Sequence, residues 1–307
     1  MKTALLFSGQ GSQYVGMLKD VYENSSFAKD LINHANEVVG FNLSEICFDG
    51  PLETLKETRY TQPAIFLHSA VAFSLIGEKL DFLGVAGHSV GEYAALYAAG
   101  VLRFDDAIRL VAKRGKLMFE AGTHLPGTMF AVINLDDEKL IDVCRELTEK
   151  GDGNVVVPAN FNSPGQIVVS GSADYLRQNV EAFKAAGARM VKELVVSGAF
   201  HSPLMEPAKL ELEAEINSIE FNDAKVPVYA NVTAAPVTDA TQIKQLLINQ
   251  LISPVLWTKT MENMNKQGFE AVIEIGPGNV LQGLAKRTVS EFSIEGIDNF
   301  KDLQKYL

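Results

Sequence analysis

Cysteine is scarce in this chain, and the motifs that commonly hold metal ions are absent. Its 307 residues include only two cysteines, Cys47 and Cys144, and a chain of this length can bury enough surface to fold without disulfides. The sequence has no H-E-x-x-H and no C-x-x-C pattern, so it predicts no metal site. The low thiol content predicts a reducing, cytoplasmic location.

Basic residues and long apolar runs are also in short supply. The chain has 27 Lys and Arg residues against 38 Asp and Glu residues, a formal net charge of -11, whereas nucleic-acid binding usually needs a basic surface. No segment approaches the length of about 18 uninterrupted apolar residues that indicates a membrane-spanning helix. The apolar run after Lys2 is too short for a secretion signal. We therefore expect no nucleic acid and no membrane among its partners.

Short apolar segments alternate with helical patterns along the chain, which predicts an α/β protein. Buried strands are expected over residues 4–8 and 82–87, and helices over 21–39, 62–80 and 93–99. Pro63 would then occupy the first turn of its helix, where a missing N–H does no harm. The helix over 62–80 is apolar on nearly all sides, so we expect it to be buried all round.

Residues 127–197 have a pattern of their own. Strands are expected over 128–135, 155–162, 166–171 and 189–196, and helices over 137–150 and 173–186. The resulting order, β-α-β-β-α-β, is that of a ferredoxin-like unit. We predict that 127–197 is an inserted subdomain, and that 1–126 and 198–307 together form one discontinuous domain.

A G-x-S-x-G pattern formed by Gly87, Ser89 and Gly91 lies between an apolar strand and an Ala-rich helix. This is the context of a nucleophile elbow, in which a tight turn presents the serine hydroxyl above the sheet. It predicts a parallel-sheet core resembling that of α/β-hydrolases, with Ser89 beside the N-terminus of a helix. The alternative is a serine that merely caps this helix.

A nucleophilic serine needs a base, and the chain offers five histidines: His34, His68, His88, His124 and His201. The first two lie in helical patterns and suit packing or surface roles. His88 is within the elbow and is expected to point away from the serine hydroxyl. His124, in a polar loop, and His201, in a loop at the predicted domain junction, both remain candidates, and the junction slightly favours His201.

Several stretches, in order from about residue 4 to about residue 290, resemble the malonyl-CoA:acyl carrier protein transacylase family. They are F-S-G-Q-G-S-Q from Phe7, G-H-S-V-G-E from Gly87, K-R-G-K-L-M from Lys113, A-F-H-S-P-L-M from Ala199, N-Q at Asn249, and G-P-G from Gly276. An ordered series of motifs is far more specific than a G-x-S-x-G pattern alone.

The resemblance implies a role for each matching residue of the reaction centre. Ser89 would be the nucleophile and His201 its general base. The backbone carbonyl of Gln250 would orient the histidine, so the arrangement would be a dyad without a carboxylate. The backbone N–H groups of Gln10 and Val90 would form the oxyanion hole.

The resemblance also implies how the acyl group is selected. Arg114 would bind the malonyl carboxylate through two parallel hydrogen bonds, although from the helical pattern alone it would be a solvated surface residue. Phe200 would leave little room for an α-methyl branch. Gln62 and Asn162 are expected near the cleft. Ser8 stands where many family members have proline, which predicts a looser turn before Gln10.

The implied activity is transfer of malonyl from malonyl-CoA to the phosphopantetheine thiol of acyl carrier protein, through a malonyl-Ser89 ester, for fatty-acid elongation. The expected partners are malonyl-CoA and acyl carrier protein, and no cofactor is expected because the coenzyme A thioester is a substrate. The alternatives are a freestanding acyltransferase of a polyketide pathway, a serine esterase or thioesterase, and an inactive scaffold. Because carriers in this family are acidic, six basic residues are candidates for the contact: Lys113, Lys116, Arg189, Lys192, Lys286 and Arg287.

Overall fold

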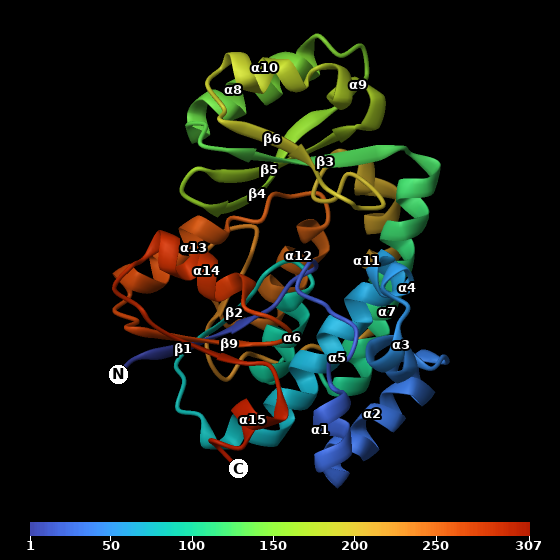
Figure 1. The fold of residues 1–307 in the computed structure, drawn as a ribbon, viewed down its shortest axis with the longest axis vertical. Helices are drawn as coiled ribbons and strands as arrows, with labels where there is room; N and C mark the ends of the chain where they lie inside the picture. The colour runs from blue at the N-terminus through green and yellow to red at the C-terminus, as the bar shows by residue number, and fades with distance from the viewer.

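The computed structural model describes all residues from 1 to 307, and its larger part is built on a six-stranded sheet (Figure 1). The strand order is β10-β9-β1-β2-β7-β8. The first five strands run parallel, and β8 is antiparallel to β7. The strands are β1 (Thr3–Phe7), β2 (Val85–Gly87), β7 (Val228–Tyr229), β8 (Pro236–Val237), β9 (Ala271–Ile275) and β10 (Ser293–Ile297).

This sheet is buried on both faces, as parallel sheets generally are. Leu5 and Phe7 of β1 belong to a cluster of 53 buried residues, whereas Ala4 and Leu6 belong to a separate cluster of 15. Strand side chains alternate between faces, so the unbroken apolar run of β1 supplies both clusters. β1 therefore has to be central.

Helices and two short 3-10 segments surround this sheet. The larger cluster contains residues of α5 and α7, and the smaller one contains residues of α13 and α14. The helices are α1 (Lys19–Asn24), α2 (Ser26–Val39), α3 (Leu43–Asp49), α4 (Leu52–Lys56), α5 (Thr58–Ile76), α6 (Gly91–Ala98), α7 (Phe104–His124), α11 (Glu206–Ser218), α12 (Ala240–Gln250), α13 (Trp257–Lys266), α14 (Val280–Thr288) and α15 (Phe300–Leu303), with η1 (Gly77–Lys79) and η2 (Pro203–Met205). None combines the length and hydropathy that crossing a membrane requires.

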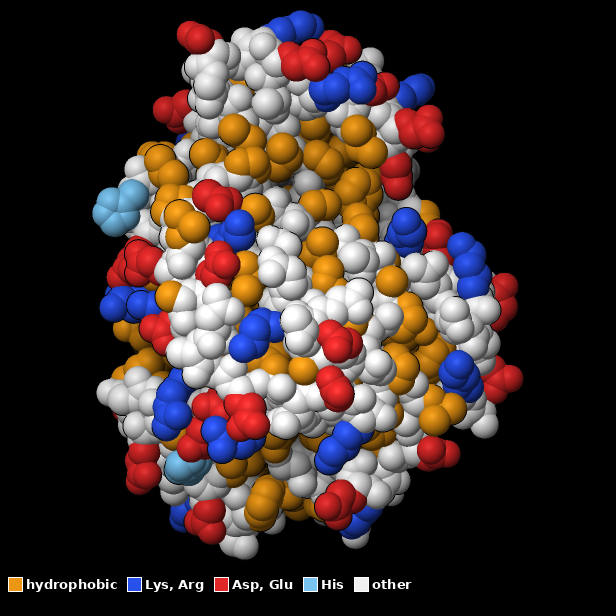
Figure 2. All heavy atoms as spheres, turned by 180° about the vertical axis from the view of Figure 1, so that it is seen from behind, with side chains coloured by type: hydrophobic (Ala, Val, Ile, Leu, Met, Phe, Trp, Pro, Cys, Tyr) orange, Lys and Arg blue, Asp and Glu red, His pale blue; other side chains and the backbone are white.

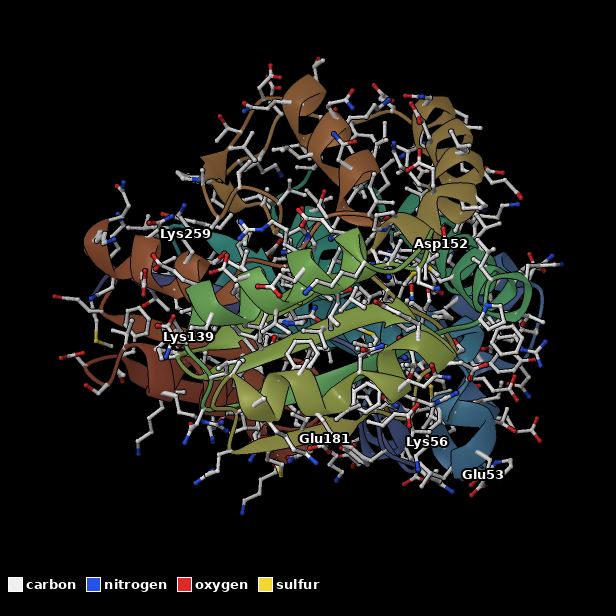
Figure 3. All side chains as sticks on the ribbon, turned by 90° about the horizontal axis from the view of Figure 1, so that it is seen from above. Glu53, Lys56, Lys139, Asp152, Glu181 and Lys259 are labelled. Carbon is white, nitrogen blue, oxygen red and sulfur yellow. The ribbon has the colours of Figure 1, made fainter.

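A second, antiparallel sheet forms the upper part of the molecule in Figure 1. Its order is β4-β5-β3-β6, with β3 (Gly127–Ile133), β4 (Val156–Ser163), β5 (Gln166–Ser172) and β6 (Met190–Glu193). Helices α8 (Asp137–Glu149), α9 (Ala173–Gln178) and α10 (Val180–Ala185) cover one face. Seen from above, Lys139 of α8 and Glu181 of α10 lie over this sheet (Figure 3).

The two sheets meet through backbone hydrogen bonds and through shared packing. The N–H of Phe161 donates to the carbonyl of Val255 at 2.9 Å, and the N–H of Val255 donates to the carbonyl of Ala159 at 2.9 Å. Met129 and Val168, on the face away from α8, join the large cluster of the lower part. Seen from behind, hydrophobic side chains gather below the charged upper end (Figure 2).

Several predicted boundaries were wrong for local reasons. The single helix expected over 21–39 is two helices, because Ser25 is extended and its side chain caps α2. The helix expected from residue 62 begins at Thr58, so Pro63 lies inside it rather than in its first turn. Its nearly complete burial was predicted correctly.

The upper part also differs in detail from the prediction. The helix expected over 173–186 is interrupted at Asn179 and forms α9 and α10. The last strand is shorter than the predicted 189–196 and spans only Met190–Glu193. His124 is not in a loop but ends α7, with its Nδ1 bonded to the carbonyl of Glu120 at 2.8 Å.

Candidate active site

Ser89 follows β2 in a turn that only small neighbours allow. Its φ is 52°, a left-handed conformation that is uncommon for a residue with a side chain. A Cβ on Gly91 would lie 2.2 Å from the carbonyl oxygen of Phe7, and one on Gly87 would lie 2.0 Å from the backbone of Gly91. The two glycines therefore let α6 begin directly against the end of β1, with Ser89 above the sheet.

The structure brings His201 to the Ser89 hydroxyl. Ser89 Oγ and His201 Nε2 are 2.8 Å apart. On the other side of the ring, Nδ1 lies 3.0 Å from the carbonyl oxygen of Gln250 and 3.1 Å from that of Ser253. Carbonyl oxygens only accept, so Nδ1 carries the proton and Nε2 is free to accept one from the serine. His201 too is left-handed, with a φ of 56°.

His201 is held in its neutral form. Burial lowers the pKa of His201 to about 3, and the nearby positive charge of Arg114 acts in the same direction. Both effects disfavour an imidazolium ion. A neutral imidazole at physiological pH can act as a base without first losing a proton.

Arg114 is fully buried and lies against the reacting pair, contrary to what its helical pattern alone predicted. Its guanidinium donates to Gln62 Oε1 at 2.6 Å, to Gln250 Oε1 at 3.0 Å and to Ser89 Oγ at 3.1 Å. Its Nε has no partner, and no carboxylate is bonded to it. A buried guanidinium bonded only to neutral groups can still bind an anion strongly.

Two residues of this network, Glu92 and Asn231, were not identified from the sequence. The Asn231 side chain accepts the N–H of Ser89 at 2.8 Å and donates to the carbonyl of Gly87 at 2.7 Å. Glu92 Oε2 accepts the N–H of Asn231 at 3.1 Å and the side-chain amide of Gln250 at 2.8 Å. Glu92 directly follows the elbow glycine, which is a sequence signal. Asn231 lies in a distant loop and carries none.

The loop after β1 lies beside the elbow. A Cβ on Gly9 would be 2.6 Å from the carbonyl oxygen of His88, so only glycine allows this approach. The backbone N–H groups of Gln10 and Val90 make no hydrogen bond within the chain. The Gln10 side chain donates to the Thr58 hydroxyl at 3.2 Å. Gln10 lines the same cavity as Ser89, and unpaired backbone N–H groups near a nucleophile can stabilise a developing oxyanion.

The sequence predicted that Ser8 would loosen the turn before Gln10, but the structure shows Ser8 bonded in place. Ser8 is fully buried, and its hydroxyl donates to Glu274 Oε1 at 2.9 Å. Glu274 also accepts the backbone N–H groups of Leu281 and Gln282 at the start of α14. Ser8 thus ties the loop to a neighbouring strand and helix.

A cavity of about 150 Å³ opens beside Ser89 and His201, between the two sheets. It is lined by Gln10, His88, Ser89, Met118, Met129, Asn160, Asn162, Val168, Leu194, Val196, Phe200 and His201. His88 lines the same cavity as Ser89, and its ring bonds Asn162 Oδ1 at 2.8 Å rather than the serine. No group of three or more His, Cys, Asp or Glu side chains is arranged to hold a metal ion.

The family described as acyl transferase domain matches residues 4–304, almost the whole chain. A malonyl CoA-acyl carrier protein transacylase of Staphylococcus aureus is 41% identical over 304 residues, 99% of this chain and 97% of the relative. One of Haemophilus influenzae is 39% identical over 312 residues, covering 100% and 99%. This chain belongs to the malonyl CoA-acyl carrier protein transacylase family.

Solved structures of malonyltransferases share the fold of this chain. An acyl carrier protein S-malonyltransferase from Vibrio cholerae matches with a TM-score of 0.93 at 41% identity, covering 99% of both chains. A malonyl-transacylase solved in complex with its type II PKS acyl-carrier protein matches with a TM-score of 0.93 at 39% identity, covering 100% of this chain and 99% of the other.

Proposed function

We propose that this enzyme transfers malonyl from malonyl-CoA to the phosphopantetheine thiol of an acyl carrier protein, by a ping-pong reaction through a malonyl ester of Ser89. The observation that carries the proposal is the 2.8 Å contact between Ser89 Oγ and a neutral His201 Nε2, beside a buried Arg114 that has no carboxylate partner. No cofactor is needed, because the coenzyme A thioester is itself the substrate.

Each step uses groups already in place. Ser89 Oγ attacks the thioester carbonyl while His201 Nε2 takes its proton. The N–H groups of Gln10 and Val90 stabilise the tetrahedral oxyanion. The imidazolium then protonates the departing coenzyme A sulfur, which leaves malonyl on Ser89. In the second half His201 takes the proton of the carrier thiol, which attacks the ester, and returns a proton to Ser89. The carbonyl of Gln250 keeps the ring in the required tautomer.

Selection of the acyl group rests on a small set of side chains. Arg114 binds the malonyl carboxylate and fixes the acyl group in one pose while the ester waits for the carrier. Gln62 holds the guanidinium at 2.6 Å. Phe200, which is buried at the cavity wall, narrows the space for an α-branch, and Asn162 steadies the elbow through His88.

The two sheets suggest how the chain is organised. We assign residues 1–126 and 198–307 to a catalytic domain with a core like that of α/β-hydrolases, and 127–197 to a ferredoxin-like subdomain. The strand order of the second sheet and its covering helices favour this division. The cleft between the two parts would admit the phosphopantetheine arm of the carrier protein. Basic residues such as Lys286 and Arg287 would contact the acidic carrier, so the association rate should fall as salt is added.

Intact-protein mass spectrometry after mixing with malonyl-CoA tests the proposal. We expect one malonyl adduct on the wild type and none on Ser89→Ala, and loss of the adduct when a holo carrier protein is added. Rapid release of free malonate, with or without carrier, would instead identify a hydrolase. No adduct on folded wild-type protein would contradict the proposed activity.

The second candidate function is malonyl transfer to the carrier protein of a polyketide pathway. A structure 39% identical to this chain is a malonyl-transacylase in complex with its type II PKS acyl-carrier protein. Comparing transfer rates to a fatty-acid carrier and a polyketide carrier under the same conditions distinguishes the two.

A further inference from the structure

Glu92 is a buried carboxylate in the middle of the catalytic network, and the transfer mechanism gives it no task. Only 2% of its surface is exposed. Both of its hydrogen bonds end on Oε2, one from the N–H of Asn231 and one from the side-chain amide of Gln250. A charge this deeply buried is costly unless it is balanced by an opposite one.

The opposite charge is Arg114, which Glu92 reaches through Gln250. The amide oxygen of Gln250 accepts from Arg114 Nη2 at 3.0 Å, while its amide nitrogen donates to Glu92 Oε2 at 2.8 Å. The amide thus bridges a cation and an anion that do not touch. When a malonyl carboxylate binds Arg114, two anions would share one guanidinium, and one of them should become neutral.

We propose that Glu92 is an exchangeable counter-charge: it balances Arg114 in the empty site and takes up a proton from solvent when a malonyl carboxylate occupies that site. The inference rests on the proposed function. A proton on Oε1 leaves both hydrogen bonds to Oε2 in place, so the network keeps its geometry in either state. Selectivity for a charged acyl group would then depend on Glu92 as well as on Arg114.

Among the ionisable side chains around Arg114, Glu92 is the one whose charge changes near neutral pH. Burial raises the pKa of Glu92 to about 7, although the hydrogen bonds from Gln250 and Asn231 and, to a smaller extent, the charge of Arg114 oppose the rise. Tyr93, on the same helix, has a pKa raised by burial to about 12. Burial lowers the pKa of His201 to about 3 and also lowers that of His88. Near neutral pH the tyrosine and both histidines are uncharged, so an added proton goes to Glu92.

Proton uptake by the wild type is the direct test. Acyl transfer moves the Ser89 proton to the coenzyme A sulfur, so at pH 7.5 the chemistry alone consumes no proton. In weak buffer with an indicator dye, and with coenzyme A alone as baseline, we expect uptake of up to about three quarters of a proton per ester, since a carboxyl with a pKa of about 7 is about three quarters ionised at that pH. The ester is counted by mass spectrometry.

Glu92→Gln is the matched control, because its amide oxygen can accept both hydrogen bonds now made to Oε2. It should form the ester without proton uptake. The KM of the wild type for malonyl-CoA should rise above pH 7, by up to about tenfold per unit, with little change in kcat, and the KM of the variant should stay flat.

Two results would overturn the inference. One is ester formation by the wild type without proton uptake, a measurement that needs no variant. The other is a folded Glu92→Gln protein that keeps the wild-type pH dependence of KM. Absence of any malonyl ester would count against the proposed function instead, so the two failures are distinguishable.

Discussion

Replacing Arg114 by alanine should convert a malonyl-selective enzyme into one that prefers neutral acyl groups. The side chain is fully buried and lies 3.1 Å from Ser89 Oγ, so a bound malonyl carboxylate would lie in a site screened from water. Removing one partner of a buried ion pair typically costs about 3–5 kcal/mol. At about 1.4 kcal/mol per factor of ten, kcat/KM for malonyl-CoA should fall by about 10²–10⁴.

Acetyl-CoA supplies the contrast, because it has no carboxylate to lose. Its kcat/KM should stay the same or rise. The ratio of kcat/KM for malonyl-CoA to kcat/KM for acetyl-CoA should therefore fall by at least the factor lost for malonyl-CoA. The assay is a stopped-flow measurement of thiol release in single turnovers, with adduct masses read in parallel. Arg114→Lys is the control, since it keeps the charge but loses the bidentate hydrogen bonding of a guanidinium. Its kcat/KM for malonyl-CoA should lie between those of the wild type and the alanine variant.

The alanine variant should also change the pH profile. The charge of Arg114 helps to lower the pKa of His201, so without it that pKa should rise and acylation should begin to fail at a higher pH than in the wild type. Thermal unfolding must show that the variant is folded, because Gln62 and Gln250 each lose a partner. Unchanged malonyl kinetics in a folded Arg114→Ala protein would refute the role assigned to this residue.

Three further predictions concern the elbow and its base. Because the pKa of His201 is lowered to about 3, the base is neutral above that value, so kcat for acylation should be nearly constant from pH 5 to 8; a fall around pH 6.5 would contradict this. Asn231→Ala should slow acylation of Ser89 by about tenfold or more and cost about 1–3 kcal/mol of stability. Single-turnover kinetics measures the first effect and urea unfolding the second. Normal acylation in this variant would show that the elbow needs no support from Asn231. Gly91→Ala should lose about 1–3 kcal/mol of stability or more, since its Cβ would meet the end of β1. Gly283→Ala, whose Cβ meets only a flexible side chain at 3.7 Å, should lose none. Equal thermal stability of the two variants would refute the steric explanation.

The sequence by itself determined the local features of this protein. Periodicity located β1, β2 and the alternation of strands and helices over 127–197, although not the break at Asn179 that divides one expected helix in two. The glycines on either side of Ser89 identified the elbow, because a tight turn leaves its mark on adjacent residues. Boundaries were less certain where a single side chain decides them, as at Ser25, where a cap separates two helices.

Only the tertiary structure decided how distant residues meet. From pattern alone Arg114 was a surface residue and His201 barely ranked above His124, because a helix or a loop does not reveal what packs against it. Arg114 of α7 is buried where it meets Gln62 of α5 and Gln250 of α12, and the loop after β6 brings His201 to Ser89. Asn231 reaches the same site from the end of another strand. Hydrogen bonds between residues more than 100 positions apart leave no periodic trace in a sequence, so the charge network around Glu92 exists only in the folded chain.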